Sequence, residues 1–205
     1  MIPTIYCADV GSIPKGNFAW AQLQPSATAC FSGTDIRALA ESVVAGLDSG
    51  QPIALGFECP MFVPVRTVPE HLSRARSGEG SRSWSAGAGP AVLATGLVQS
   101  AWLLETIRSS LGTEPAVFLD WGAFAGRGSG LFVWEALVSG AAKTGTHTGD
   151  AEAAVLAFRR ALPDPRSRNC IAEPRTLSLV AAALLWSGWN VPPGLLRQPS
   201  LVVAA

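Results

Sequence analysis

Four carboxylates stand where the sequence predicts the ends of strands or the start of a helix. Asp9, Glu58 and Glu135 each end an apolar run that is typical of a buried strand, and Asp150 opens a helix-like stretch. An ionised carboxylate at the end of a buried strand is costly unless a cation pairs with it. Mg²⁺ and Mn²⁺ prefer such hard oxygen ligands. The pattern therefore predicts a divalent metal site formed by Asp9, Glu58, Asp150 and Glu135.

The chemistry that such a site supports is hydrolysis of a phosphodiester. Two metal ions about 4 Å apart can activate the attacking water and stabilise the leaving oxygen. His147 lies three residues before Asp150, just ahead of the predicted helix, where it can position the water or shuttle its proton. We therefore expect Asp9, Glu58, Asp150 and His147 to be catalytic.

Most of these residues also have a purely structural interpretation. Asp9 can cap the turn that contains Gly11. Asp150 can serve as the N-cap of the predicted helix, with Glu152 as a first-turn acid whose negative charge stabilises the helix dipole. Glu135 can form an ion pair with an arginine. Glu58, which lies among apolar residues, is the hardest of the four to explain structurally.

A segment rich in Arg, Gly and Ser, residues 59–90, lacks a regular pattern. Guanidinium groups can form forked hydrogen bonds with phosphates, and a tryptophan ring can stack on a base. A flexible surface loop fits the same composition. The residues of this loop that we expect to bind substrate are Arg74, Arg76, Arg82 and Trp84.

The composition limits the class of protein. Of the 205 residues, 48% are hydrophobic and 15% are charged, which predicts one globular domain with a sizeable core. The 15 basic and 15 acidic residues cancel, so no global positive field favours long nucleic-acid duplexes. The cysteines lack the spacing of a zinc site and are expected as reduced thiols of a cytoplasmic protein. We recognise no signal peptide and no stretch that is long enough to cross a membrane.

Strands and helices alternate along the chain. Residues 2–9 and 17–24 predict an antiparallel hairpin, with a weakly marked third strand near 28–31. The next element expected is a helix that follows the N-cap residues 32–35 and runs to about Leu47. The elements expected after it are a strand over 53–58, a helix over 91–111, strands over 115–121 and 131–136 around a Gly-rich connection, and helices over 149–162 and 175–188. The residues after Pro193 either add a strand or fray.

These elements predict the fold class. A helix-length crossover favours a parallel return, so strand 53–58 should lie parallel to strand 2–9. We expect one α/β domain over 1–205, with a mixed sheet, an antiparallel N-terminal hairpin and helices on both faces. The long loop at 59–90 and a C-terminal helical extension from about residue 165 complete it.

At these residues the chain resembles the ribonuclease H-like superfamily, and more closely the bacterial Holliday-junction resolvases and a group of predicted nucleases with that fold. The resemblance covers about residues 1–160 and rests on Asp9-Val10-Gly11, on Glu58 and on the stretch from His147 to Ala151. It implies a ribonuclease H-like fold whose acidic positions bind Mg²⁺ or Mn²⁺ and cut a phosphodiester. The loop at 59–90 has no counterpart in the resemblance.

Three functions follow from this pattern. The first is a metal-dependent phosphodiesterase or nuclease whose partner is nucleic acid. The second is a non-catalytic module of the same fold that binds a nucleotide or a protein. The third is a phosphotransferase of the actin and sugar-kinase type, but such enzymes usually have two domains. Trp186 and Trp189 are expected to anchor either the core or a homodimer interface.

Overall fold

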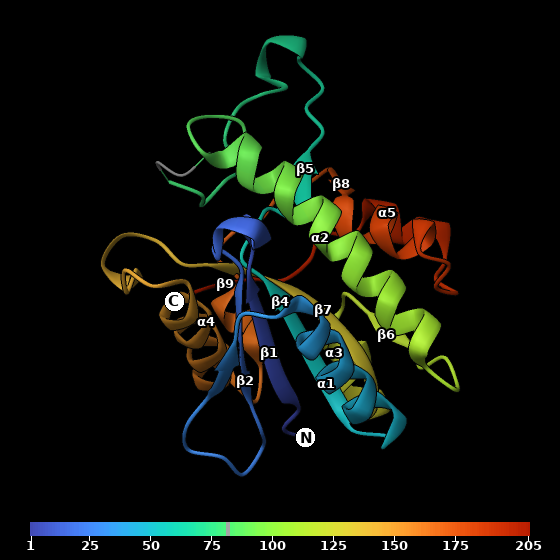
Figure 1. Cartoon of the computed structure of the whole chain (residues 1–205). Helices are drawn as coiled ribbons and strands as arrows, with labels where there is room; N and C mark the ends of the chain where they lie inside the picture. The colour runs from blue at the N-terminus through green and yellow to red at the C-terminus, as the bar shows by residue number, and fades with distance from the viewer. Residues whose placement is uncertain (81–82) are drawn as a thin grey trace.

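The computed structural model describes residues 1–80 and 83–205. Within these residues the centre is a seven-stranded mixed sheet of order β3-β2-β1-β4-β7-β6, with β9 also paired to β7 (Figure 1). Its strands are β1 (Thr4–Asp9), β2 (Ala19–Leu23), β3 (Phe31–Gly33), β4 (Pro52–Phe57), β6 (Val117–Phe118), β7 (Gly130–Leu137) and β9 (Val202–Ala204). The helices are α1 (Ile36–Asp48), α2 (Gly89–Ser110), α3 (Trp121–Arg127), α4 (His147–Ala161) and α5 (Leu179–Trp186). Strands β5 (Phe62–Pro64) and β8 (Thr176–Ser178) form a separate antiparallel pair.

The strand pairings confirm the predicted hairpin and crossover. Strand β1 pairs antiparallel with β2. After α1 the chain returns in β4, which lies parallel to β1 with Ala8 opposite Phe57. Strand β7 lies parallel to β4 on its other side. The carboxyl ends of β1, β4 and β7 therefore meet at one edge of the sheet, the position where such sheets usually bind ligands.

Helices cover both faces of the sheet, as predicted. Successive side chains of a strand point to opposite faces. Tyr6 and Ala8 of β1 pack in one apolar cluster with α1, α2 and α5. Ile5 and Cys7 pack in a second cluster with α3 and α4. Figure 1 shows α2 and α5 next to each other on one side and α4 on the other.

Helix α1 forms the crossover for local reasons. The side chain of Asp35 caps its first turn by accepting a hydrogen bond from the backbone N–H of Arg37. The buried residues Leu39, Val43 and Leu47 recur at helical spacing, so one stripe of the helix faces the sheet. This amphipathic helix sets the parallel return of β4.

A close contact between Gly56 and Trp134 fixes the pairing of β4 with β7. A Cβ at position 56 would lie 2.4 Å from the indole of Trp134, so glycine lets the ring lie against β4. Trp134 is fully buried, and its ring centroid lies 4.5 Å from that of Phe158 in α4. The contact holds α4 against the sheet.

Two stretches differ from the prediction. The expected strand over 115–121 contains only the two residues of β6, and the expected Gly-rich connection contains helix α3. Asp120 caps α3 by accepting a hydrogen bond from the backbone N–H of Ala123, and the rings of Trp121 and Phe124 are buried. The expected helix over 175–188 begins with strand β8 and becomes helical at Leu179. The last residues form β9, parallel to β7.

The tryptophans near the C-terminus have different environments. Trp189 is buried, and its Nε1 donates a hydrogen bond to the carbonyl of Leu104 over 3.0 Å, so it anchors the core. Trp186 is 67% exposed, and a homodimer contact through it stays a prediction. The four cysteines are free thiols. In the part of the chain that the structure describes, every helix is too short or too polar to cross a membrane.

Candidate metal centre

The parallel pairing of β1 and β4 brings Asp9 and Glu58 together. Asp9 is the last residue of β1, and Glu58 directly follows β4. The backbone N–H of Glu58 donates to the carbonyl of Ala8 over 2.8 Å, which continues the ladder beyond the strand. Asp9 is 5% exposed and the side chain of Glu58 is 12% exposed. Both carboxylates therefore lie side by side with little access to water.

The first turn of α4 supplies the other two predicted residues. Thr146 caps this turn with its side chain, which starts the helix at His147. His147 and Asp150 are three residues apart and so lie on one side of the helix. The Nδ1 of His147 lies 2.7 Å from Oδ2 of Asp9. Asp150 accepts hydrogen bonds from the backbone N–H and the hydroxyl of Thr144, over 2.7 and 3.0 Å.

Asp9, Glu58 and Asp150 converge on a common point. One carboxylate oxygen from each lies within 4.8 Å of the others, so the three residues could hold a metal ion. Oε2 of Glu58 is buried and has no hydrogen-bond partner among the described residues. Such an oxygen costs free energy unless it is paired, and a cation at this point would pair it. Oxygen donors of this kind fit Mg²⁺ or Mn²⁺.

Lys143 places a positive charge within this cluster. Its Nζ lies 2.7 Å from Oε1 of Glu58 and 2.7 Å from Oδ2 of Asp150. A divalent cation would have to displace or repel this ammonium, because like charges at such distances repel. Lys143 was not predicted from the sequence, where its only signal is its position in the segment that leads from β7 to His147.

The environment changes the pKa of each carboxyl differently. Burial raises the pKa of Asp9, and the hydrogen bond with His147 opposes this change. Burial and the charge of Asp9 raise the pKa of Glu58 to about 7, although Lys143 opposes them. Burial also acts on Asp150, but hydrogen bonds from Lys143 and Thr144 outweigh it and lower its pKa. A metal ion binding near neutral pH must therefore displace a proton from Glu58 in part of the molecules.

We expect Glu58 to make the metal-free protein less stable as the pH rises from about 5 to 8. The pKa of Glu58 is about 7 in the folded protein, whereas an unperturbed Glu has a pKa of about 4.3. The stabilising contribution is therefore complete below about pH 4.3 and is lost as the pH rises through 7. Urea unfolding without metal should show a loss on the order of 1 to 3 kcal/mol. Glu58→Gln should show a smaller loss, and an equal loss in both proteins would contradict the assignment.

Glu135 was predicted as a metal ligand, but it lies outside the cluster of Asp9, Glu58 and Asp150. Its side chain is buried, and its two oxygens accept hydrogen bonds from Arg76 over 2.7 and 2.9 Å. The backbone N–H of Met61 also donates to Oε2 over 2.9 Å. Both oxygens are therefore used in a buried ion pair, the structural alternative that the sequence left open.

Arg76 is buried instead of facing a substrate, which corrects a second prediction. It is 3% exposed, and its guanidinium lies between Glu135 and Glu79, with Nη2 3.0 Å from Oε1 of Glu79. The guanidinium carbon also lies 4.8 Å from the centre of the Phe62 ring. A group with these partners is not available to bind phosphates.

The other loop residues that were predicted to contact substrate differ in their exposure and in their contacts. Arg74 is exposed, and its carbonyl accepts a hydrogen bond from Nε1 of the half-buried Trp84 over 3.1 Å. Substrate contacts through these two residues stay predictions. Arg82 lies outside the described residues. Arg66 forms an ion pair with Glu173, with Nη2 2.8 Å from Oε1, and so ties the loop to the C-terminal part of the chain.

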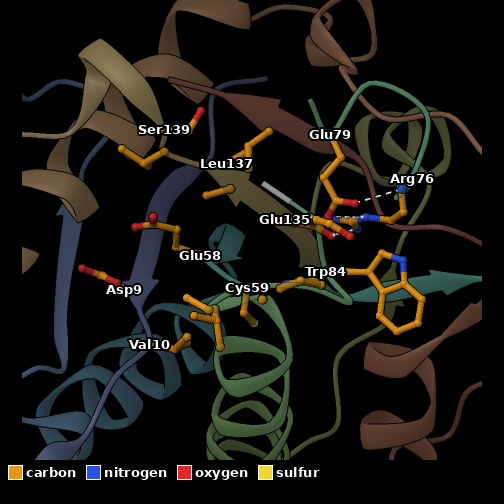
Figure 2. A pocket seen from close by; sticks show the side chains of 18 of the residues that line it. Asp9, Val10, Glu58, Cys59, Arg76, Glu79, Trp84, Glu135, Leu137 and Ser139 are labelled. Atoms are coloured by element: carbon orange, nitrogen blue, oxygen red, sulfur yellow. Dashed lines mark hydrogen bonds and ion pairs between the residues drawn. The ribbon is translucent and has the colours of Figure 1, made fainter. Parts of the chain in front are cut away.

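Asp9, Glu58, Lys143 and His147 line a pocket of about 370 Å³. Figure 2 shows Asp9 and Glu58 at one side of it and the group of Arg76, Glu79 and Glu135 at the other. The start of α2 and the segment after β7 supply much of the wall between them. The candidate metal centre therefore lies at one end of a pocket that can hold part of a ligand.

Comparison with known protein families, with curated proteins and with solved structures finds no match to this chain.

Proposed function

We propose that the protein is a metal-dependent phosphodiesterase that hydrolyses nucleic acid, with Mg²⁺ or Mn²⁺ held by Asp9, Glu58 and Asp150. The observation that carries the proposal is the convergence of these three carboxylates, together with a buried oxygen of Glu58 that has no hydrogen-bond partner among the described residues. Carboxylates placed so close to one another repel, and a divalent cation removes that repulsion. The position of Asp9 and Glu58 at the end of a pocket supports a role in catalysis rather than in folding alone.

Each residue has a role that follows from its contacts. A bound metal ion would act as a Lewis acid toward the phosphate and would lower the pKa of the attacking water. The hydrogen bond that Nδ1–H of His147 donates to Asp9 fixes the orientation of the His147 ring. The His147 side chain is 45% exposed, so its other nitrogen can take the proton as a water oxygen attacks phosphorus. The leaving oxygen departs with a proton from solvent.

The order of the elements supports the ribonuclease H-like assignment as part of the proposal. The antiparallel hairpin, the parallel return of β4 and the late helix with His147 and Asp150 occur as that resemblance implies. The acidic residues at the ends of β1 and β4 and at the start of α4 are those on which the resemblance rests. The fold and the site thus favour the same proposal.

Binding of Mn²⁺ should raise the melting temperature, and Asp9→Asn should abolish the rise. An ion that binds only the folded state stabilises it by about 2.7 kcal/mol at a concentration 100 times its Kd. For a domain of this size that free energy corresponds to a rise of roughly 5 to 10 °C. A thermal melt with Mn²⁺ and with EDTA measures the effect.

Asp48→Asn provides the matched control for this experiment. Asp48 is exposed at the end of α1, so this variant should keep the full rise with Mn²⁺. Equal rises in the wild type and in Asp9→Asn would refute a metal centre at these carboxylates.

Lys143 gives a specific reason to keep the non-catalytic module as a second candidate. Its ammonium already bridges Glu58 and Asp150, so the cluster has an internal counter-ion without any metal. If Mn²⁺ leaves the melting temperature unchanged, the carboxylates and Lys143 form a structural network. The protein would then be a binding module for a nucleotide or a protein partner.

A further inference from the structure

We propose that the pocket beside the carboxylates binds a single nucleobase, so that the substrate offers one unpaired nucleotide to the metal centre. This inference rests on the proposed function and names the class of substrate. It follows from the size of the pocket, from the chemistry of its walls and from the pairing of its charges.

The size of the pocket fits one nucleotide unit. Its volume of about 370 Å³ lies near the lower end of the range for small-ligand pockets, about 300–1,000 Å³. A base that remains paired and stacked in a duplex cannot enter such a space. Enzymes that act on single nucleotides use unpaired strands, or turn the nucleotide out of the duplex into a close-fitting pocket.

The walls between the two charged ends are largely apolar. Val92 comes from the first turn of α2, and Leu137 and Val138 come from the end of β7 and the residue after it. Val10 and Cys59 follow the two acidic strand ends and contribute on the side nearest the carboxylates. Burial of a flat neutral group against these side chains contributes about 25 cal/mol for each Å² removed from water.

The charges of the pocket favour a neutral group over a second phosphate. Among the described residues that line the pocket, the Arg and Lys side chains are Arg76 and Lys143. Arg76 is paired with Glu79 and Glu135, and Lys143 is paired with carboxylates of the metal cluster. Neither cation is left to hold the several backbone phosphates that duplex-binding proteins contact. The chain as a whole also has a net charge of zero.

The pocket and the metal centre are close enough to act on the same nucleotide. Asp9, Glu58 and His147 line the pocket that also contains Val92 and Leu137. A phosphate held at the carboxylates therefore places its attached sugar and base at the apolar walls. The ligand chemistry is a phosphate joined to a nucleobase, which either a free nucleotide or a single strand provides.

The test compares ligands that differ in the base alone, with Mn²⁺ present. We expect wild-type protein to bind a nucleoside 5′-monophosphate at least about tenfold more tightly than ribose 5-phosphate in calorimetric titrations. Val92→Trp fills the pocket and should remove this difference, while the rise in melting temperature with Mn²⁺ persists. Val98→Trp places the same residue on the same helix at a position that is 69% exposed, and should leave the difference unchanged.

Further measurements distinguish a base that belongs to a strand from one that belongs to a free nucleotide. They also distinguish failure of the base pocket from failure of the proposed function. A single-stranded oligonucleotide that binds more tightly than the monophosphate supports a base from a strand, and the reverse supports a free nucleotide. Equal affinity for the monophosphate and ribose 5-phosphate in wild-type protein with an intact Mn²⁺ effect overturns the base pocket alone. A duplex that binds more tightly than the single strand also overturns it. Absence of the Mn²⁺ effect in the wild type overturns the proposed function together with this inference.

Discussion

Arg76→Met should reduce the free energy of unfolding by about 3 to 5 kcal/mol, because it leaves two buried carboxylates without their cation. Arg76 donates to both oxygens of Glu135 and to Oε1 of Glu79, and all three side chains are almost fully buried. Methionine keeps the approximate length of the side chain but provides no positive charge. Urea unfolding measured at pH 7 in EDTA gives the size of the loss.

Arg74→Met is the matched control for this variant. Arg74 lies two positions earlier in the same loop but is exposed, so its loss should change stability by less than about 0.5 kcal/mol. We expect Arg76→Met to melt at a lower temperature than the wild type. At temperatures where this variant is folded, Mn²⁺ should still stabilise it, because Arg76 contacts neither Asp9 nor Asp150. A small stability loss combined with weaker binding of nucleic acid would instead restore Arg76 as a substrate contact.

Asp150→Asn should lower the rate of phosphodiester hydrolysis at least about 100-fold in saturating Mn²⁺. Changes to residues that only support metal ligands typically reduce metal affinity or activity 10- to 100-fold, and Asp150 is proposed as a ligand itself. Asparagine keeps the shape of the side chain and the start of α4, but it removes the charge. Turnover of single-stranded and branched nucleic acids measures the loss.

Binding of the same nucleic acids separates catalysis from recognition. Affinity in Asp150→Asn should stay within about threefold of wild type, because the apolar walls that we assign to the base are unchanged. Asp48→Asn should keep both binding and turnover. Wild-type turnover in Asp150→Asn would exclude Asp150 from the reaction and with it the proposed ligand set.

The parts of the site that the sequence predicted come from regular elements. The apolar runs that end at Asp9 and Glu58 are strands, and the helix between them sets their parallel register. Parallel register brings the two strand ends together, so the closeness of these residues followed from periodicity. Asp150 indicated a helix start through the residue preferences of a helix N-terminus, but the N-cap is Thr146 and Asp150 lies in the first turn of α4.

The parts that the sequence did not predict depend on contacts between irregular segments. Arg76 lies in a loop without periodicity, and its partner Glu135 is distant in the sequence, so no local pattern joins them. Lys143 is likewise unmarked, because its role depends on where the segment after β7 runs. Helix α3 was missed because its glycines indicate a turn, although Asp120 is a recognisable N-cap.

The burial of Arg76 has a consequence for the entropy of ligand binding. One wall of the pocket comes from residues 59–60, 76, 79, 83–84 and 86–89, which belong to the least regular part of the chain. Ion pairs of Arg76 and Arg66 nevertheless hold the residues around them to β7 and to Glu173. Fixing a free backbone residue costs about 1 to 2 kcal/mol. Because this wall is ordered before any ligand arrives, that cost falls on folding rather than on binding. When a ligand buries apolar surface against this wall, little of the favourable free energy is therefore offset by the entropy cost of ordering the wall.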